Sequence, residues 1–328
     1  MIIVTGGAGF IGSNVLAHLS ESRRSQLVVC DWLESGDKWR NIASSAIDDV
    51  IAPEALARFL DDNADAIEAV IHMGAISSTT ETDVDLIVRS NIRLTNDIWD
   101  WCTRTQTPFI YASSAATYGN GEAGFDDDMS VDALRTLAPL NAYGWSKHLV
   151  DQRIARRVAA GDRTPPQWAG LKFFNVYGPN EYHKGGQKSV VAHIHPAASA
   201  GETVKLFRSH NPAYEDGGQL RDFVYVKDCA AIIAWLLDTP SVSGLFNVGT
   251  GEARSFKDLA TAVFAALNRT PDISYVDTPV AIRDKYQYFT QADMQRLRAA
   301  GYTGTPTSLE DGVAEYVRSY LETDNPYR

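Results

Sequence analysis

Cysteines and long apolar runs are scarce in this chain of 328 residues, and each scarcity excludes a class of protein. The three cysteines, Cys30, Cys102 and Cys229, lie far apart and form no CxxC pair. Neither a disulfide framework nor a structural zinc site is therefore expected, and no metal is assigned. The longest apolar run, 230–237, is too short to cross a membrane, and no leader segment is visible before it. We expect a soluble protein of the cytoplasm with no membrane partner.

Positive charge is also in short supply. Lysine and arginine number 30 against 41 aspartate and glutamate residues, which gives a formal net charge of −11. Proteins that bind nucleic acids usually neutralise phosphates with a basic surface, so nucleic acid is not an expected partner. The hydrophobic fraction of 45% suits a globular chain that buries a large core without covalent staples.

Short apolar runs alternate with helical patterns through the first half of the chain. Strands are expected at 2–4, 27–30, 69–72, 109–112 and 170–174, and helices at 10–19, 84–104 and 143–158. This alternation predicts an α/β fold with a doubly wound parallel sheet of the Rossmann type. After residue 175 the pattern breaks, and two further strands, 223–226 and 245–248, flank a helix at 227–237. We expect a dinucleotide-binding domain of residues 1–176 plus about 219–250. A smaller, discontinuous α/β substrate domain would comprise about 177–218 plus 251–328.

A glycine-rich turn follows the first expected strand. Gly6, Gly9 and Gly12 form a G-x-x-G-x-x-G pattern that opens a helix, where a pyrophosphate can approach the backbone and the helix N-terminus. About 20 residues further on, Asp31 ends the second strand, where a carboxylate can accept the ribose hydroxyls of NAD. Lys38 follows closely and suits the 2′-phosphate of NADP, so the residues leave the choice between the two cofactors open.

A Y-x-x-x-K pattern begins the helix expected at 143–158. The spacing of four places Tyr143 and Lys147 on one helix face, and a nearby ammonium favours the phenolate. The pKa of Tyr143 is therefore expected to fall below its usual ~10, so that the phenol can exchange a proton with a substrate hydroxyl. Upstream, Ser114 or Thr117 follows a strand and can hydrogen-bond the reacting oxygen.

These motifs together resemble the extended short-chain dehydrogenase/reductases, which act on nucleotide-linked sugars. The runs F-N-V-Y-G-P at 174–179 and R-D-F-V-Y-V at 221–226 match that family as well. Longer runs are similar to the ADP-L-glycero-D-manno-heptose 6-epimerases within it: M-I-I-V-T-G-G-A-G-F-I-G-S-N, S-S-T-T-E at 77–81, Y-A-S-S-A-A-T-Y-G, H-K-G at 183–185 and Y-F-T-Q-A-D at 288–293.

The resemblance implies an isomerase that inverts C6 of ADP-D-glycero-D-manno-heptose, on the way to the inner core of lipopolysaccharide. It implies hydride transfer through a 6-keto intermediate, with one tightly bound NADP per subunit and NAD as the alternative. It also implies a homo-oligomer, with the homopentamer as a candidate size. An epimerase of the UDP-hexose 4-epimerase type remains the alternative, because Tyr143 and Lys147 serve both reactions. Lys184 in its H-K-G context favours the heptose enzyme.

Roles carry over from the resemblance residue by residue. The implied catalytic residues are Ser114, Tyr143, Lys147 and Lys184, the last as a second acid/base. The implied cofactor-binding residues are Gly6, Gly9, Phe10, Ile11, Gly12, Asp31, Trp32, Lys38, Met73, Gly74, Ala75, Ile76, Ser77, Ser90, Asn91, Tyr143, Lys147, Val176 and Lys184. The implied substrate-binding residues are Asn175, Gly186, His193, Phe207, Arg208, Ser209, His210, Arg221 and Tyr286.

The sequence departs from the family pattern at several of these places. Met73 stands where the family has a polar acidic residue, and the loop from Phe207 to Arg221 is longer than expected. Gly186 stands where the family has a serine, so that contact to the sugar is lost, and Ser90-Asn91 replaces an Asn-Asn pair. Two further residues receive a structural interpretation. His72 is expected to be a hydrogen-bonded core histidine, and Asp127, within the run Asp126–Asp128, is expected to lie in a solvated loop.

Overall fold

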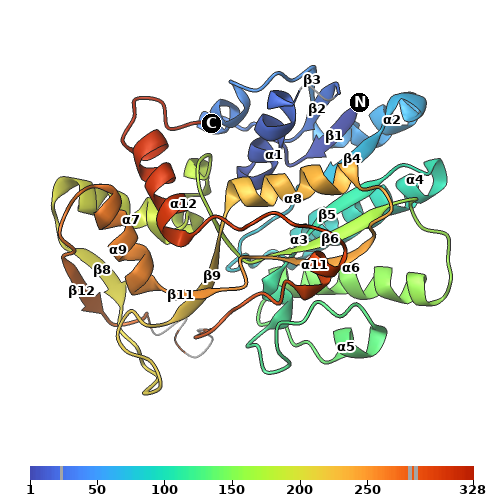
Figure 1. Ribbon diagram of the computed structural model, residues 1–328. Helices are drawn as coiled ribbons and strands as arrows, with labels where there is room; N and C mark the ends of the chain where they lie inside the picture. Colours follow the sequence, from blue (N-terminus) through green and yellow to red (C-terminus); the bar gives the residue numbers. More distant parts are fainter. Residues whose placement is uncertain (23–24, 280–282, 284–286) are drawn as a thin grey trace.

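The computed structural model describes residues 1–22, 25–279, 283 and 287–328, and a parallel sheet of seven strands forms its centre (Figure 1). The strand order is β10-β6-β5-β4-β1-β2-β3, and every neighbouring pair is parallel. The strands are β1 (Ile2–Thr5), β2 (Leu27–Cys30), β3 (Asp49–Ile51), β4 (Ala69–His72), β5 (Phe109–Ser114), β6 (Trp168–Phe173) and β10 (Gly244–Val248). The predicted doubly wound α/β fold is confirmed, because the apolar runs of the sequence form strands with helices on both faces.

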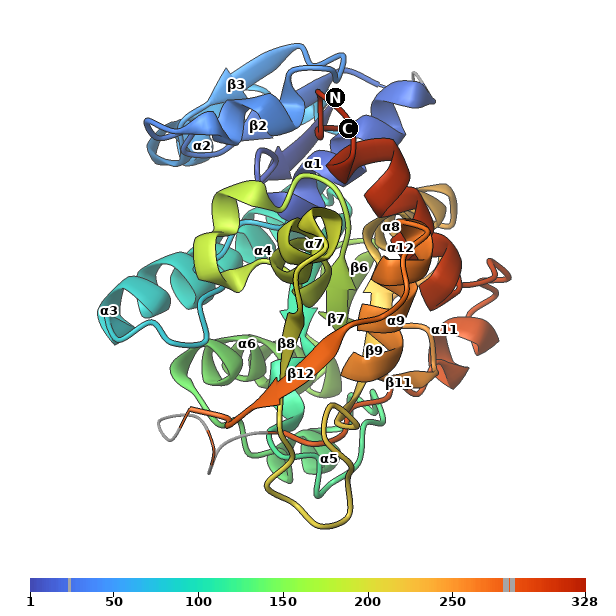
Figure 2. The ribbon, with the colours of Figure 1, turned by 90° about the vertical axis from the view of Figure 1, so that its left-hand side faces the viewer.

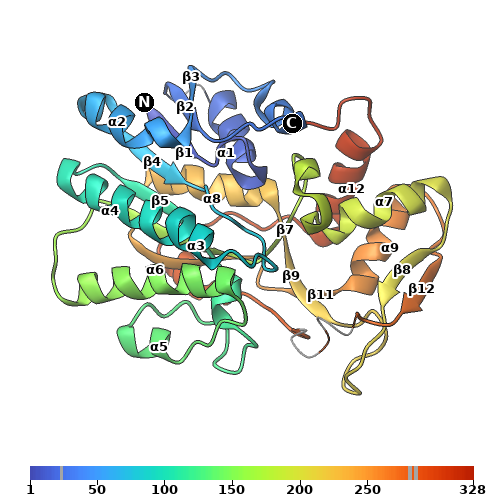
Figure 3. The ribbon, with the colours of Figure 1, turned by 180° about the vertical axis from the view of Figure 1, so that it is seen from behind.

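Two pairs of long helices cover the faces of this sheet. On one face α1 (Phe10–Glu21) packs against α8 (Val226–Asp238), and on the other lie α4 (Leu94–Thr105) and α6 (Ala142–Ala159) (Figures 1 and 3). Shorter helical segments complete this part: η1 (Asp37–Ile42), η2 (Pro53–Ala55), α2 (Leu56–Asp62), η3 (Ala64–Ala66), α3 (Val84–Ile87), η4 (Val88–Arg93), η5 (Ala115–Tyr118) and α5 (Val131–Arg135). Separate apolar clusters fill the two sides, with Leu16 and Ile233 in one and Trp99 and Ile154 in the other.

A second group of elements lies beside the carboxyl ends of the central strands (Figure 2). Its strands are β7 (Asn175–Tyr177), β8 (Val204–Phe207), β9 (Leu220–Tyr225), β11 (Ala253–Ser255) and β12 (Ile273–Val276). They form a three-stranded sheet, β11-β9-β7, and a two-stranded sheet, β12-β8. Its helical segments are η6 (Tyr182–Gln187), α7 (Val190–Ala200), α9 (Phe256–Ala266), α11 (Gln295–Ala299), α12 (Leu309–Tyr316) and η7 (Val317–Leu321). The expected domain boundaries remain a prediction. Within the stretch 219–250, β9 pairs with β7 and β11, whereas β10 belongs to the seven-stranded sheet and α8 packs on it beside α1.

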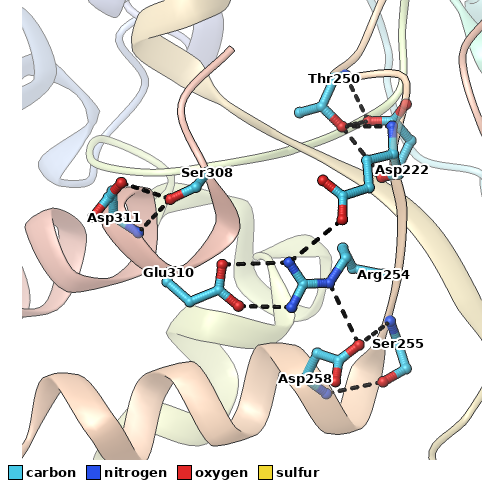
Figure 4. A network of polar contacts seen from close by, with 9 residues as sticks. Asp222, Thr250, Arg254, Ser255, Asp258, Ser308, Glu310 and Asp311 are labelled. Atoms are coloured by element: carbon cyan, nitrogen blue, oxygen red, sulfur yellow. Dashed lines mark hydrogen bonds and ion pairs between the residues drawn. The ribbon is translucent and has the colours of Figure 1, made fainter.

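An arginine on β11 ties several of these elements together (Figure 4). The Arg254 guanidinium donates to both oxygens of Glu310 on α12, at 2.6 and 3.3 Å. Its Nε lies 3.5 Å from the carboxylate of Asp258, which forms a capping box with Ser255 at the start of α9. One side chain thus joins β11 to two helices, and this fixes the strand that lies beside β9.

His72 and Asp127 have different outcomes. His72 is fully buried, with ring nitrogens 2.6 Å from the Thr5 hydroxyl and 2.9 Å from the Thr95 hydroxyl, so the core interpretation is confirmed. The solvated interpretation of Asp127 is wrong. Its side chain is buried and accepts a hydrogen bond from the Asn247 backbone at 2.7 Å, and burial raises its pKa to about 6.

The predicted state of the cysteines is confirmed: Cys30, Cys102 and Cys229 are free and buried. Among the described residues, no helix is both long enough and apolar enough to span a bilayer.

Candidate functional site

Three adjoining cavities open at the carboxyl ends of the central strands. The first, of about 410 Å³, begins where β1, β2 and β4 end. The second, of about 960 Å³, begins where β5 and β6 end, and the third, of about 610 Å³, continues from it. Phe10, Met73 and Lys184 line both the first and the second cavity, so these two are neighbours. In open α/β sheets, ligands bind outside the carboxyl ends of the strands, which is where these cavities lie.

The glycine-rich turn forms one wall of the first cavity. Gly9 is the N-cap of α1 and provides no side-chain cap, so the helix start is left open for another acceptor. A Cβ atom at Gly12 would lie 2.2 Å from the Gly6 carbonyl oxygen, so only glycine permits this close turn. An uncapped helix N-terminus beside bare backbone fits the diphosphate of a dinucleotide.

Asp31 links the end of β2 to the glycine-rich turn. One carboxylate oxygen accepts from the Ala8 backbone N–H at 3.0 Å, and the other from Lys38 Nζ at 2.8 Å. Lys38 also donates to the Trp32 carbonyl oxygen at 2.8 Å. This corner of the cavity therefore presents a carboxylate and an ammonium side by side, which suits a ribose and an adjacent anion.

Of the pair that departs from the family pattern, Ser90 lines the first cavity and Asn91 lies behind its wall. The Asn91 side chain is buried, accepts from the Ile76 N–H at 2.8 Å and donates to the Ile76 carbonyl at 2.9 Å. It also donates to the Ser146 hydroxyl at 3.0 Å. Asn91 thus anchors the segment after β4 to α6.

Fourteen of the residues expected to bind the cofactor line the first cavity in addition to Lys184. They are Gly6, Gly9, Phe10, Ile11, Gly12, Asp31, Trp32, Lys38, Met73, Gly74, Ala75, Ile76, Ser77 and Ser90. Tyr143, Lys147 and Val176 line the second cavity, and Lys184 lines both.

Ser114, Tyr143 and Lys147 meet at the wall of the second cavity. Asn141 caps α6 by accepting from the Gly144 N–H at 2.8 Å. A Cβ atom at Gly144 would lie 2.6 Å from the Ala116 carbonyl, so the helix start rests directly on the loop that follows Ser114. This close packing brings Tyr143 to Ser114.

The charge states of this pair differ from expectation. Burial raises the pKa of Tyr143 above its usual value, and the interaction with the Ser114 hydroxyl opposes the rise only in part. The expected fall is therefore wrong for the protein alone, because loss of solvent around the phenol raises the pKa more than the Ser114 hydroxyl lowers it. Burial also lowers the pKa of Lys147 to about 8, against the attraction of Asp151.

A fully buried ion pair lies behind these residues. Lys172 Nζ on β6 is 3.3 Å from the carboxylate of Asp151 on α6 and donates to the Thr117 hydroxyl at 2.6 Å. The Ser113 hydroxyl donates to the same carboxylate at 2.6 Å. Thr117 is therefore engaged in the core, and Ser114 is the hydroxyl that faces the cavity.

Lys184 reaches the cavities from η6, on the opposite group of elements. Its ammonium lies 5.1 Å from the centre of the Phe10 ring, and burial lowers its pKa while Glu181 opposes the shift. Glu181 is fully buried and accepts from the Ser189 hydroxyl at 2.6 Å and from the Tyr316 hydroxyl at 3.0 Å. The segment that carries Lys184 is thus anchored to α7 and α12.

Three of the expected substrate-binding residues, Asn175, Gly186 and Arg221, line the second cavity. The Arg221 guanidinium lies 5.6 Å from the centre of the Phe256 ring. The next residue, Asp222, is buried and accepts from the Thr250 N–H at 2.7 Å and hydroxyl at 2.8 Å (Figure 4). It thereby fixes the strand on which Arg221 lies.

Among the described residues, the other five expected to bind substrate do not line the three cavities. Exposed His193 has its Nε2 3.2 Å from the Gly186 carbonyl oxygen, directly behind the wall. Arg208 pairs with Asp277 at 3.2 Å; Phe207 is the last residue of β8, and Ser209 and His210 follow Arg208. Tyr286 lies outside the described residues.

Several lining residues were missed as individual site residues. Thr79 and Thr80 line the second and third cavities, and Gln287 and Thr290 line the third. All but Gln287 fall within runs quoted for the family resemblance, so those runs were the available signal. Phe256, at the start of α9, also lines the second cavity. It carried no such signal, because an apolar residue at the start of a helix is expected to be part of the hydrophobic core.

Comparison with known proteins gives consistent relatives. A family model described as the NAD dependent epimerase/dehydratase family matches residues 2–249. The ADP-L-glycero-D-manno-heptose-6-epimerase of Nitratidesulfovibrio vulgaris (strain DP4) is 47% identical, and the match covers 100% of both chains. The crystal structure of the Helicobacter pylori protein of that name has a TM-score of 0.79 at 29% identity and covers 97% of this chain and 95% of its own.

A further solved structure, MoeE5 in complex with UDP-glucuronic acid and NAD, has a TM-score of 0.72 at 27% identity, covering 95% of this chain and 96% of its own. The family model spans the glycine-rich turn, the Tyr143–Lys147 helix and Arg221, and the relatives match over almost the full length. The chain belongs to the NAD dependent epimerase/dehydratase family and, within it, to the ADP-L-glycero-D-manno-heptose-6-epimerases.

Proposed function

We propose that this chain inverts C6 of ADP-D-glycero-D-manno-heptose to give the L-glycero epimer. The observation that carries the proposal is that two proton-transferring groups line one cavity from separate elements. Tyr143 enters from α6 with Ser114 beside it, and Lys184 enters from η6. Relatives of full length, at up to 47% identity, bear the name of this enzyme.

Two such groups suit the chemistry of an unactivated alcohol. No carbonyl adjoins C6, so direct removal of its carbon-bound hydrogen as a proton is prohibitively hard, and oxidation to a 6-keto sugar avoids that step. The ketone then presents its other face, which leaves the reacting oxygen in a different place in each half-reaction. We assign Tyr143 to the proton in one pose and Lys184 to the proton in the other. Lys147 keeps a positive charge close to Tyr143, and Ser114 donates to the reacting oxygen.

The first cavity is assigned to one tightly held NADP per subunit, with NAD as the alternative. The uncapped start of α1 would bind the diphosphate, and Asp31 with Lys38 would bind the adenosine ribose and its phosphate. When bound, the nicotinamide would take the hydride from C6 and return it to the opposite face. Mass spectrometry of the nucleotide released from denatured protein identifies the cofactor.

The elements beside the sheet are assigned to the substrate. Arg221 suits a phosphate of the ADP group, because a partly enclosed guanidinium binds phosphate oxygens in a fork. Asn175 and the backbone of Gly186 lie where the sugar would pass between the two groups of elements. We assign residues of about 177–218 and 251–328 to substrate binding, the assembly to a homo-oligomer, and the location to the cytoplasm.

A proton NMR time course with ADP-D-glycero-D-manno-heptose tests the proposal. Conversion to the L-glycero epimer is expected with purified protein and no added nucleotide, because each turnover restores the cofactor. Absence of conversion, with or without added NADP and NAD, would contradict the proposal. Interconversion of UDP-glucose and UDP-galactose in a parallel sample would instead support the 4-epimerase alternative.

A further inference from the structure

The last residues of the chain return to its beginning. After η7 the chain crosses back toward α1, and its last residue contacts the end of that helix (Figure 1). Residues 326–328, named the strap here, contact both the segment that carries Lys184 and the elements around the glycine-rich turn. We propose that the strap holds the 179–188 segment closed over the first cavity and thereby keeps the dinucleotide bound. This inference rests on the proposed function for the identity of that ligand.

The 179–188 segment already touches the nucleotide side of the cleft. The Asn14 side chain on α1 donates to the Pro179 carbonyl oxygen at 2.9 Å. The Asn180 side chain is buried and donates to the Ser13 hydroxyl and the Asn41 carbonyl oxygen, each at 3.1 Å. Through His183, Lys184 and Gln187 the same segment lines the first cavity. Its position therefore determines how the cavity is closed.

The strap bridges the two sides through Arg328. The Arg328 backbone N–H donates to the Asn180 side-chain oxygen at 2.9 Å. Its guanidinium donates to both carboxylate oxygens of Glu21 at the end of α1, at 3.1 and 3.2 Å. One residue thus binds the 179–188 segment through its backbone and the first helix through its charge.

The neighbouring strap residues repeat this bridge. The Tyr182 hydroxyl donates to the Pro326 carbonyl oxygen at 2.7 Å. The Tyr327 ring lies edge-on to Tyr182, with 5.3 Å between ring centres, and under the Arg40 guanidinium, 4.4 Å from it. Tyr182 belongs to η6, and Arg40 belongs to η1 beside the glycine-rich turn. Tyr327 is therefore held between the same two sides that Arg328 joins.

Retention of the dinucleotide has a specific purpose in a reaction that gives back the hydride it removes. If the reduced cofactor dissociated after the first half-reaction, the 6-keto sugar could not be reduced again. The net reaction would then be an oxidation instead of an epimerisation. A segment that closes the cavity and is tied at both sides prevents that loss, while the substrate can still enter through the larger second cavity. The strap residues touch neither cavity wall directly, so they act as positioning residues.

The test compares Arg328→Ala and Tyr182→Phe with wild type. Bound NADPH is displaced by excess NADP, and its fluorescence decay gives the dissociation rate; NADH and NAD form a second arm. We expect dissociation to accelerate about ten-fold in Arg328→Ala, the effect of one lost charge-assisted hydrogen bond. Less nucleotide should co-purify, and added NADP should restore kcat in the variants without raising it in wild type. Tyr182→Phe removes the bond to Pro326 and the interaction with the Tyr316 hydroxyl, and it keeps the ring.

Arg318→Ala is the matched control. Arg318 Nε donates to the Ala266 carbonyl oxygen at 2.9 Å, so this arginine anchors the same terminal region to α9 without joining the strap contacts. It should leave the dissociation rate unchanged. Equal rates in wild type, Arg328→Ala and Tyr182→Phe would overturn the inference. The fluorescence measurement needs no sugar nucleotide, so faster NADPH release supports the strap even if the heptose is not epimerised.

Discussion

The Arg328 backbone N–H and the Asn180 side-chain oxygen form a hydrogen bond of 2.9 Å across 148 positions of the chain. Asn180 also donates to Ser13 and to Asn41, so a single side chain joins α1, η1 and the residues after η7. Its backbone has a φ of +71°, a left-handed conformation that asparagine tolerates better than most residues.

Asn180→Ala should therefore destabilise the protein. The substitution leaves buried partners unsatisfied, and we expect the free energy of unfolding to fall by about 2–4 kcal/mol in urea denaturation. Asn268→Ala is the control, because Asn268 also has a positive φ, +55°, but is exposed. Similar losses in the two variants would attribute the effect to backbone conformation instead of to the buried bonds.

Tyr143→Phe should remove one of the two proton-transferring groups. We expect kcat to fall by about 10²–10⁴-fold, the usual contribution of a positioned acid or base. The amount of co-purified nucleotide, measured in parallel, separates loss of the proton-transferring group from loss of cofactor binding. A variant that keeps wild-type turnover of ADP-heptose would exclude the phenol from the reaction.

Lys184→Met should have a comparable effect on kcat if the second pose requires its own acid/base. Methionine keeps most of the apolar stem beside Phe10, so the packing of η6 should persist. Lys205→Met, at an exposed position on β8, controls for loss of a positive charge. Near-normal kcat with a raised KM would show instead that Lys184 only binds phosphate.

Acid should destabilise the protein in part through His72. Burial lowers its pKa to about 3, whereas the unfolded chain titrates near ~6.5, so the unfolded state binds more protons between these values. The stability that neutral His72 contributes is complete above about pH 6.5 and declines as the pH falls toward 3. By pH 4.5 the loss should reach about 2–3 kcal/mol.

Urea titrations of wild type and His72→Gln from pH 7 to 4.5 measure this contribution. Glutamine does not titrate in this range. The unfolding free energy of His72→Gln should therefore decline less between pH 7 and 4.5 than that of wild type, by about 2–3 kcal/mol. Parallel declines in the two proteins would show that His72 titrates normally in the folded state.

The central sheet could be predicted because its strands are short apolar runs, and a buried parallel strand such as 69–72 carries that signature by itself. The glycine-rich turn and the Tyr143–Lys147 pair were equally accessible, since fixed spacing places their atoms. The pKa of Tyr143 was not, because it depends on how much solvent the second cavity leaves around the phenol.

Contacts between residues far apart in the chain could not be predicted from the sequence either. Three consecutive aspartates indicate a solvated loop, yet Asp127 turns inward to a backbone N–H of Asn247, 120 residues later. For Arg208 and its neighbours, the resemblance supplied a role, but the position of a loop after an edge strand depends on packing that no local pattern records. Arg208 pairs with Asp277 beside β12, and its role in substrate binding stays a prediction.

The buried pair of Lys172 and Asp151 constrains how this sequence can change. Removing either partner alone would strand a charge in the core, at a cost of about 3–5 kcal/mol, whereas an apolar pair of similar volume can be neutral. A single substitution at either position therefore lowers stability, and the two residues are expected to change together during evolution. The consecutive elements α6 and β6 are in this way constrained to change together at these two positions.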